Sequence, residues 1–239
     1  MKETLVLIPG TLCNATLFQH QVAGLADLAD CYVADSSRAN ELGAVAGAIL
    51  AEVAGDFALL GLSYGGIVAF EILRQAPRRV KKLILLNTNY RLPSETTRVN
   101  QERWVGMTCL GRFEEVTTDF LTDAMLHPDH AQDPAMRAAV LEMARAVGPD
   151  GFIRQVKAQL GRPDSTSDLP RITCPTLLIT GHEDRICPVA LHQEMAALIP
   201  GAHLKIIAGC GHLSTLEQPE QVTQCIRNWW LEHQTHETK

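Results

Sequence analysis

The sequence of 239 residues predicts an α/β fold: a mostly parallel sheet of about six strands, with helices on both faces and a helical insertion. Three observations support this prediction. Short apolar runs alternate with helix-like stretches, as in parallel sheets built from crossover connections. The runs are apolar almost throughout, which is typical of strands covered on both faces. The stretch 91–169 contains no strand-like run and interrupts the alternation.

Six runs rich in branched side chains predict the strands, and each ends near Gly, Asn or Asp. They lie at 4–10, 31–37, 57–63, 80–87, 175–181 and 203–209.

Helix-like stretches separate these runs. Asn14 and Asn40 each precede an amphipathic stretch and are expected to act as N-caps. A third helix over 64–77 ends at a proline, and Pro188 stands at the expected first position of another. A last helix is predicted over 217–233. Strand and helix thus alternate on both sides of the insertion.

The stretch 91–169 predicts helices joined by turns that contain Gly or Pro. Four are expected, at 94–111, 113–126, 133–148 and 149–161, followed by a polar connector at 162–172. An insertion of this length exceeds a simple crossover and is typical of a lid. We therefore predict a core formed by 1–90 and 170–239, with a helical cap formed by 91–169.

Composition and charge exclude several classes of protein. The net charge of −6 argues against a nucleic-acid partner, since phosphate binding needs a basic surface. The apolar run from Leu5 to Pro9 is too short for a signal peptide or a membrane span. Seven cysteines without a Cys-x-x-Cys pair indicate reduced thiols. We expect a cytoplasmic monomer or homodimer with a small-molecule substrate, no membrane partner, and no cofactor or metal.

The stretch "GLSYGG" at 61–66 places Ser63 in a Gly-x-Ser-x-Gly pattern. Alone, this pattern arises by chance in about one chain in ten of this size. Here it lies between a predicted strand and a predicted helix, where a sharp turn exposes a serine above the sheet. Gly61 and Gly65 suit the crowded turn, and the helix N-terminus favours developing negative charge. Ser63 is therefore the candidate nucleophile rather than part of an ordinary glycine-rich loop.

A serine needs a base, and the base needs a partner that orients it. His212 follows the last predicted strand and Asp184 follows the strand before it. Both therefore lie at the edge of the sheet that carries Ser63. Glu183 is the alternative acid if the strand ends one residue earlier. The fourth strand ends at asparagines, which supply no carboxylate.

The oxyanion of an acyl-transfer reaction also needs backbone donors. The N–H of Tyr64, directly after the nucleophile, is one candidate. The other is the N–H of Thr11, in the loop "IPGTLCN" that follows the first strand.

Taken together, these motifs resemble the α/β-hydrolase family over nearly the whole chain. The resemblance rests on four stretches: Pro9-Gly10-Thr11, 61–66, Asp184 after "LLITG", and Gly211-His212. The chain is also similar to a group of small bacterial hydrolases with Pro-Gly-x-Leu-Cys after the first strand and Gly-Cys-Gly-His-Leu in the last loop. The resemblance implies serine hydrolase chemistry, most often on carboxylic esters. Many relatives have His-Gly where this chain has Pro9-Gly10.

The same residues also suit other reactions. A lactonase, a thioesterase, a carbon–carbon bond hydrolase or an acyltransferase would use the same triad. A ligand receptor on a hydrolase scaffold is the non-enzymatic alternative. Epoxide hydrolases and haloalkane dehalogenases of this fold use an Asp nucleophile. Serine at position 63 therefore argues against both classes.

The insertion also supplies candidate pocket residues. Apolar side chains expected to line the pocket are Leu12, Trp104, Met107, Phe152 and Ile186. Candidates to bind a substrate carboxylate are Arg98, Arg103 and Arg154. The motif "HPDH" at 127–130 indicates a surface turn rather than a metal site, because no third ligand accompanies it.

Overall fold

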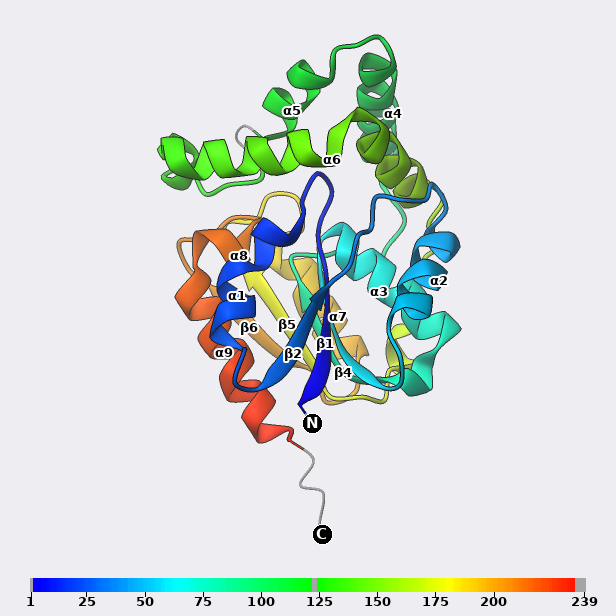
Figure 1. The fold of residues 1–239 in the computed structure, drawn as a ribbon, viewed down its shortest axis with the longest axis vertical. Helices are drawn as coiled ribbons and strands as arrows, with labels where there is room; N and C mark the ends of the chain where they lie inside the picture. The colour runs from blue at the N-terminus through cyan, green and yellow to red at the C-terminus, as the bar shows by residue number, and fades with distance from the viewer. Residues whose placement is uncertain (1, 122–123, 235–239) are drawn as a thin grey trace.

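The computed structural model describes residues 2–121 and 124–234, and these form one sheet with all neighbouring strands parallel (Figure 1). The strands are β1 Glu3–Ile8, β2 Ala29–Val33, β3 Phe57–Leu62, β4 Val80–Leu86, β5 Thr176–Gly181 and β6 His203–Ile207. Their order in the sheet is β2-β1-β3-β4-β5-β6. The predicted α/β class and the six predicted strands are confirmed.

Helices cover both faces of the sheet. On one face lie α1 Gln19–Gly24, α8 Ser214–Glu217 and α9 Pro219–Glu232, and on the other lie α2 Leu42–Glu52, α3 Tyr64–Gln75 and α7 Val189–Leu198. Each face has its own hydrophobic cluster, because successive side chains of a strand point to opposite sides.

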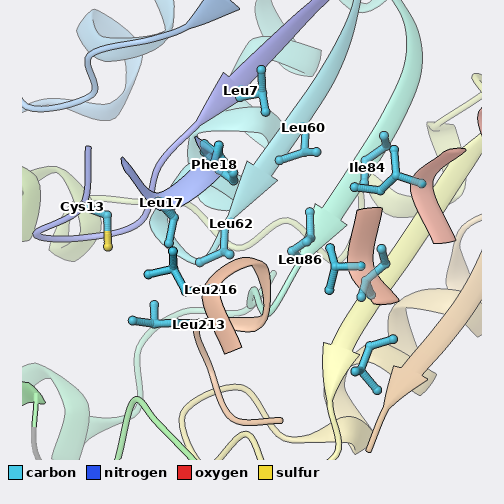
Figure 2. Packing of buried hydrophobic residues seen from close by; sticks show 14 of the residues in the cluster. Leu7, Cys13, Leu17, Phe18, Leu60, Leu62, Ile84, Leu86, Leu213 and Leu216 are labelled. Atoms are coloured by element: carbon cyan, nitrogen blue, oxygen red, sulfur yellow. The ribbon is translucent and has the colours of Figure 1, made fainter. Parts of the chain in front are cut away.

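The cluster beneath α1, α8 and α9 is shown in Figure 2. Leu7, Leu60 and Leu86 project from three neighbouring strands and pack with Phe18 and Leu216. The four residues Leu7, Leu60, Leu86 and Phe18 are 0% exposed. Burying each such side chain contributes about 1.5–3 kcal/mol relative to leaving it in water. This packing holds the strand ends, and hence the loops after them, in fixed positions.

The expectation that every strand is covered on both faces is wrong for the edges of the sheet. In β6 His203, Lys205 and Ile206 are exposed, and β2 is only partly buried. Each of these strands has one neighbour in the sheet, so its outer side meets solvent. The run of apolar residues in "HLKII" indicates a strand but does not say which one lies at the edge.

The insertion between β4 and β5 is helical, as predicted, and lies beyond the carboxyl ends of the strands (Figure 1). Its helices are α4 Glu95–Cys109, α5 Phe113–Leu121 and α6 Pro134–Leu160. The predicted third and fourth helices join as the two halves of α6. Non-helical backbone at Gly148, with φ 70° and ψ 172°, separates those halves.

The predicted helix starts are correct to within a few residues, but the caps differ. Asn14 caps a short 3₁₀ helix, Ala15–Phe18, by accepting from the Thr16 N–H at 2.9 Å, and α1 begins only after it. Asn40 caps nothing, because α2 begins at Leu42 without a side-chain cap. Pro188 occupies the position before α7 rather than its first turn.

The strand order reverses direction at β1 and β3, since the chain passes from β1 to β2 on one side and to β3 on the other. Open α/β sheets bind ligands at the carboxyl ends of the strands beside such a reversal. The loops after β1 and β3 therefore flank the expected location of a site. Among the described residues, no helix is both long enough and apolar enough to cross a membrane.

Candidate active site

Ser63 lies on a tight turn between β3 and α3. Its backbone has φ 55° and ψ −116°, a conformation that L-residues adopt at a cost of about 1–3 kcal/mol. The Ser63 N–H donates to the Leu86 carbonyl at 2.9 Å, which holds the turn against β4. A Cβ at Gly65 would lie 1.9 Å from the Ile8 carbonyl oxygen, and one at Gly61 would lie 2.4 Å from the Gly65 carbonyl oxygen. Only glycine fits at these two positions, so the pattern around Ser63 has a steric cause.

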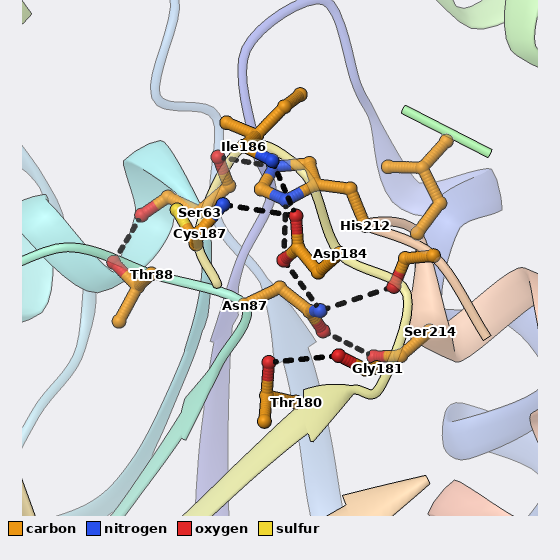
Figure 3. Close-up of polar contacts among 12 residues, drawn as sticks. Ser63, Asn87, Thr88, Thr180, Gly181, Asp184, Ile186, Cys187, His212 and Ser214 are labelled. Atoms are coloured by element: carbon orange, nitrogen blue, oxygen red, sulfur yellow. Dashed lines mark hydrogen bonds and ion pairs between the residues drawn. The ribbon is translucent and has the colours of Figure 1, made fainter. Parts of the chain in front are cut away.

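Ser63, His212 and Asp184 form one hydrogen-bonded series (Figure 3). The Ser63 hydroxyl lies 2.9 Å from Nε2 of His212. Nδ1 of His212 lies 2.9 Å from Oδ2 of Asp184. Because a carboxylate can only accept, Nδ1 carries the proton and Nε2 presents its lone pair to the hydroxyl. The structure thus brings together three residues that are 149 and 28 positions apart along the chain.

Asp184 is buried and fully hydrogen-bonded. Its Oδ1 accepts from the N–H groups of Ile186 and Cys187, each at 2.9 Å, and its Oδ2 also accepts from Asn87 at 2.9 Å. Burial alone would raise the pKa of Asp184, but electrostatic attraction to His212, its hydrogen bond and these donors outweigh burial and lower the pKa. The carboxylate therefore stays ionised. The alternative acid, Glu183, instead accepts from the Cys210 N–H at 2.8 Å.

Asn87 is a site residue that the sequence analysis passed over. It follows β4 with φ 46°, and its amide nitrogen donates to both Asp184 and the Gly211 carbonyl. Its Oδ1 accepts from the Ser214 hydroxyl at 2.6 Å. Asn87 therefore links the acid to the loop that carries His212. Its position at the end of a central strand is the sequence feature that could have identified it. The prediction from sequence concerned only the carboxylate, which an asparagine does not supply.

Thr11 and Tyr64 are the predicted oxyanion donors: Thr11 lines the same cavity as Ser63, and Tyr64 follows Ser63 as the first residue of α3. The Tyr64 N–H opens α3 and has no partner within that helix. In the loop after β1, the Leu12 N–H is taken by Oε1 of Gln155 at 3.0 Å. Gln159 bonds the Thr11 hydroxyl at 2.8 Å. These contacts from α6 hold the loop, while no hydrogen bond among the described residues engages the Thr11 N–H, which stays the second predicted donor.

The loop that carries His212 is tied to the insertion. The His212 N–H donates to the Met125 carbonyl at 2.9 Å. The buried Glu217 carboxylate accepts from the N–H groups of Leu213 at 3.0 Å and His127 at 2.6 Å. It also accepts from Nδ1 of His130 at 2.9 Å. The "HPDH" segment is therefore not a free surface turn, because it docks onto the histidine loop.

A cavity of about 560 Å³ lies between the strand ends and the insertion, and Ser63 and His212 line it. Of the predicted pocket residues, Trp104, Phe152 and Ile186 line this cavity. Leu12 and Met107 do not, and that part of the prediction is wrong. They pack instead in a small apolar cluster with Phe113, Val116, Ala144, Phe152 and Val156. Helical spacing placed Met107 beside Trp104 but could not show which face meets the cavity.

The three arginines expected to bind a substrate carboxylate do not line the cavity. Arg98 pairs on the surface with Glu95 at 3.0 Å, and Arg154 donates to the Ser37 carbonyl at 2.6 Å. Arg103 is exposed and is not part of the cavity wall. Arg162, from the connector predicted to be polar, lines the cavity instead and is 7% exposed.

Asp184, Cys187 and His212 place possible metal ligands within 4.8 Å of one another. A cysteine binds metal as a thiolate, yet burial raises the pKa of Cys187 well above its usual value. Asp184 and His212 are already hydrogen-bonded to each other. This donor set does not fit a metal site.

Comparisons with known proteins show which sequences and folds this chain is similar to. The model of the alpha/beta hydrolase family matches residues 5–224. The chain is 28% identical to a pimeloyl-[acyl-carrier protein] methyl ester esterase of Aromatoleum aromaticum, over 80% of this chain and 81% of that protein. It is similar to a thermophilic esterase from Thermogutta terrifontis solved with malate bound, with a TM-score of 0.88 and 27% identity over 98% of this chain and 92% of the other.

Other relatives are matched over a smaller share of their length. A 2-hydroxy-6-oxononadienedioate/2-hydroxy-6-oxononatrienedioate hydrolase of Pseudomonas is 27% identical over 72% of this chain. The chain spans 62% of that protein's length, 62% of another Pseudomonas hydrolase, and 8% of a Burkholderia thailandensis polyketide synthase.

Proposed function

The chain belongs to the α/β-hydrolase family, and from that premise we propose that it is a serine hydrolase that cleaves a small carboxylic ester through an acyl-enzyme on Ser63. One observation carries the proposal: the unbroken series Asp184–His212–Ser63, with 2.9 Å at each step, opening into a cavity. A serine with only a loop role needs neither a buried histidine nor an ionised acid behind it.

In the first half of the reaction the Ser63 oxygen attacks the ester carbonyl carbon. Nε2 of His212 takes the hydroxyl proton as the bond forms. Asp184, ionised and fixed by its donors, holds the Nδ1 tautomer and stabilises the imidazolium. The N–H groups of Thr11 and Tyr64 stabilise the oxyanion, and each such donor is worth about 3–4 kcal/mol in the transition state.

The first half ends when His212 gives its proton to the leaving alcohol, and the acyl group stays on Ser63. Water then enters, His212 takes a proton from it, and the hydroxide attacks the acyl carbon. Collapse of that intermediate releases the carboxylic acid and returns the proton to Ser63. We infer that α4 and α6 act as a lid, because their side chains form much of the cavity wall around Ser63.

The name of the Pseudomonas relative keeps carbon–carbon bond cleavage as an alternative use of the same residues. An ester substrate is preferred because esterases match over more of their own length, 81% and 92%. The lactonase, thioesterase and acyltransferase alternatives share the acyl-enzyme, so their substrates belong in the same assay.

The test compares the wild-type protein with Ser63→Ala. Hydrolysis of p-nitrophenyl acetate and butyrate is followed to steady state, and both proteins are treated with a fluorophosphonate probe. Ser94→Ala is the matched control, because Ser94 also lines the cavity but bonds Thr97 at the start of α4.

We expect turnover and labelling in the wild type and in Ser94→Ala, and neither in Ser63→Ala. The loss of turnover is expected to be on the order of 10⁵- to 10⁶-fold, as for removal of a serine nucleophile. A folded wild-type protein that takes no label would overturn the proposed role of Ser63. Labelling without ester turnover would keep the nucleophile and exclude simple esters as substrates.

A further inference from the structure

Arg162 is a buried cation on the wall of the cavity that contains Ser63. It follows α6, lines the cavity and is 7% exposed. Its Nε donates to the Arg91 carbonyl at 2.9 Å, and its Nη1 donates to the Gln159 carbonyl at 3.1 Å. These bonds use two of the five N–H donors of the guanidinium. Both partners are neutral, and no protein acceptor among the described residues takes Nη2.

The charge of Arg162 is not balanced by an ion pair with a described carboxylate. Asp164, two residues along the chain, forms no ion pair with it, and its Oδ1 accepts from the Thr166 N–H at 2.8 Å. Burial lowers the pKa of Arg162 to about 10, and neighbouring Cys187 and Asp164 offset this only in part. A buried charge without a partner is costly, and such charges in proteins are normally paired. Arg162 is therefore an incomplete ion pair.

The cavity as a whole favours an anion. Three arginines line it, Arg91, Arg162 and Arg185, while no described residue of its wall is Asp or Glu. Arg91 differs from Arg162 because it reaches the surface and pairs with Glu194 at 2.6 Å. A low-dielectric cavity wall strengthens the field of a cation inside it.

Arg162 is also connected to the loop after β1, which contains the proposed oxyanion donor Thr11. Gln159 accepts from Arg162 through its carbonyl and donates to the Thr11 hydroxyl through its side chain. The guanidinium of Arg162 and the hydroxyl of Thr11 are thus both bonded to Gln159 of α6. An anion on Arg162 would therefore occupy the same cavity that Thr11 and Ser63 line.

We propose that Arg162 forms an anion subsite that binds a free carboxylate of the substrate, so that the enzyme hydrolyses half-esters of short dicarboxylic acids. The reaction converts a half-ester and water into a dicarboxylate and an alcohol, with one proton released at neutral pH. The guanidinium presents a fork of N–H donors that matches a carboxylate. This inference rests on the proposed function of Ser63.

The test measures the preference of the enzyme for a charged over a neutral ester, rather than its activity on either one. The mono-p-nitrophenyl esters of succinic, glutaric and adipic acid are each compared with a matched ester that has an isopropyl group in place of the free carboxylate. The proteins are the wild type, Arg162→Met, Arg162→Lys and, as the matched control, Arg91→Met. Because Arg162→Met also removes two structural hydrogen bonds, its melting temperature is measured beside the kinetics.

The wild type is expected to prefer the carboxylate ester at one of the three chain lengths. In Arg162→Met the ratio of kcat/KM for the charged ester to that for the neutral ester falls by about 10- to 100-fold, mainly through KM, as expected for a lost charged hydrogen bond. Arg162→Lys retains part of the ratio, and Arg91→Met, which removes a charge already paired with Glu194, lowers it less than Arg162→Met does. An equal loss on both esters in Arg162→Met, or no preference in the wild type, would overturn the subsite.

Calorimetry of glutarate binding separates this proposal from the role of Ser63. Ser63→Ala is expected to bind glutarate, and the double variant Ser63→Ala/Arg162→Met is expected to bind it about 10- to 100-fold more weakly. That result would support the subsite even if no ester were hydrolysed. Neutral esters hydrolysed by a protein that does not bind glutarate would retain the proposed function and reject the subsite.

Discussion

At the scale of single residues, the acid of the site depends on a neighbour that has no charge. Asn87 donates to Asp184 at 2.9 Å and adopts a positive φ that asparagine tolerates better than most residues. Its two amide atoms have opposite hydrogen-bonding character, so it can donate to the acid while it accepts from Ser214. A carboxylate at position 87 would lie against the carboxylate of Asp184 and repel it.

Replacing Asn87 with Asp tests this arrangement. Asn87→Asp keeps the size of the side chain and the tolerance of positive φ. It replaces a hydrogen-bond donor with a second carboxylate, and the repulsion between the two carboxylates raises their pKa values. We expect kcat/KM on p-nitrophenyl acetate to fall about 10- to 100-fold, with the acidic limb of the pH profile displaced to higher pH. Asn89→Asp is the control, since Asn89 instead accepts from the Arg91 N–H. An unchanged profile in Asn87→Asp would show that Asp184 does not need this donor.

At the scale of elements, the bend in α6 decides which side chains reach the site. Its second half supplies Gln155 and Gln159 to the loop after β1, and it leads into Arg162. The bend is at Gly148, whose φ of 70° and ψ of 172° belong to a region that only glycine populates readily. A single straight helix through this point would direct those glutamines elsewhere.

A pair of glycine substitutions separates this conformational requirement from packing. A Cβ would meet nothing within 4 Å at Gly148 or at Gly106, which lies within α4. Gly148→Ala is therefore expected to destabilise the protein by about 1–3 kcal/mol through backbone strain alone. Gly106→Ala is expected to stabilise it by about 0.5–1 kcal/mol, because alanine suits a helix. Urea denaturation measures both changes, and a neutral Gly148→Ala would contradict the proposed strain.

The insertion and the core that carries the sheet are also joined by hydrogen bonds to one buried carboxylate. Glu217, on the sheet side, holds the N–H groups of His127 and Leu213 with one buried carboxylate. Residues on both sides of the cavity are therefore positioned by one group. This explains why the loop that carries His212 and the segment at 127–130 lie together, although His127 and Glu217 are 90 positions apart in the chain.

At the scale of the whole molecule, a buried neutral histidine couples folding to pH. His192 is 0% exposed, and its Nε2 accepts from the Thr88 N–H at 3.1 Å. Burial lowers its pKa to about 4 from an ordinary value of 6.5. As pH falls below 6.5 the unfolded chain takes up a proton that the folded chain does not bind until about pH 4. Stability from this group is therefore complete above pH 6.5 and lost as pH falls toward 4.

Comparison with His192→Gln isolates this contribution, because a glutamine oxygen can accept the same Thr88 N–H. Other groups titrate in this range in both proteins and cancel in the comparison. Between pH 7 and about pH 4.5 we expect the unfolding free energy of the wild type to fall by about 2–3 kcal/mol more than that of the variant. Urea denaturation at the two pH values measures it, and parallel losses would show that His192 is protonated in the folded state.

Much of the fold could be predicted from the sequence because it depends on local patterns. Continuous apolar runs indicate strands, and glycines around Ser63 indicate a turn in which a Cβ would meet backbone atoms. The order of Ser63, Asp184 and His212 places each after a strand, and parallel strands end at one edge of the sheet. The predictions that were wrong depend on which residues become neighbours in the fold. They concern the exposed edge strands, the missing cap at Asn40, and the packing of Leu12 and Met107.

The sequence by itself determined the strand–helix alternation, the turn at Ser63 and the three residues that could form a triad. Only the tertiary structure decided that Asp184 rather than Glu183 meets His212, that Asn87 supports it, and that Arg162 faces the cavity. The physical reason is the range of the interactions. Steric demands of a turn and the period of a strand act between adjacent residues, and they leave a signature in the sequence. The environment of a buried charge is made by segments far apart in the chain, so it exists only after they have packed together.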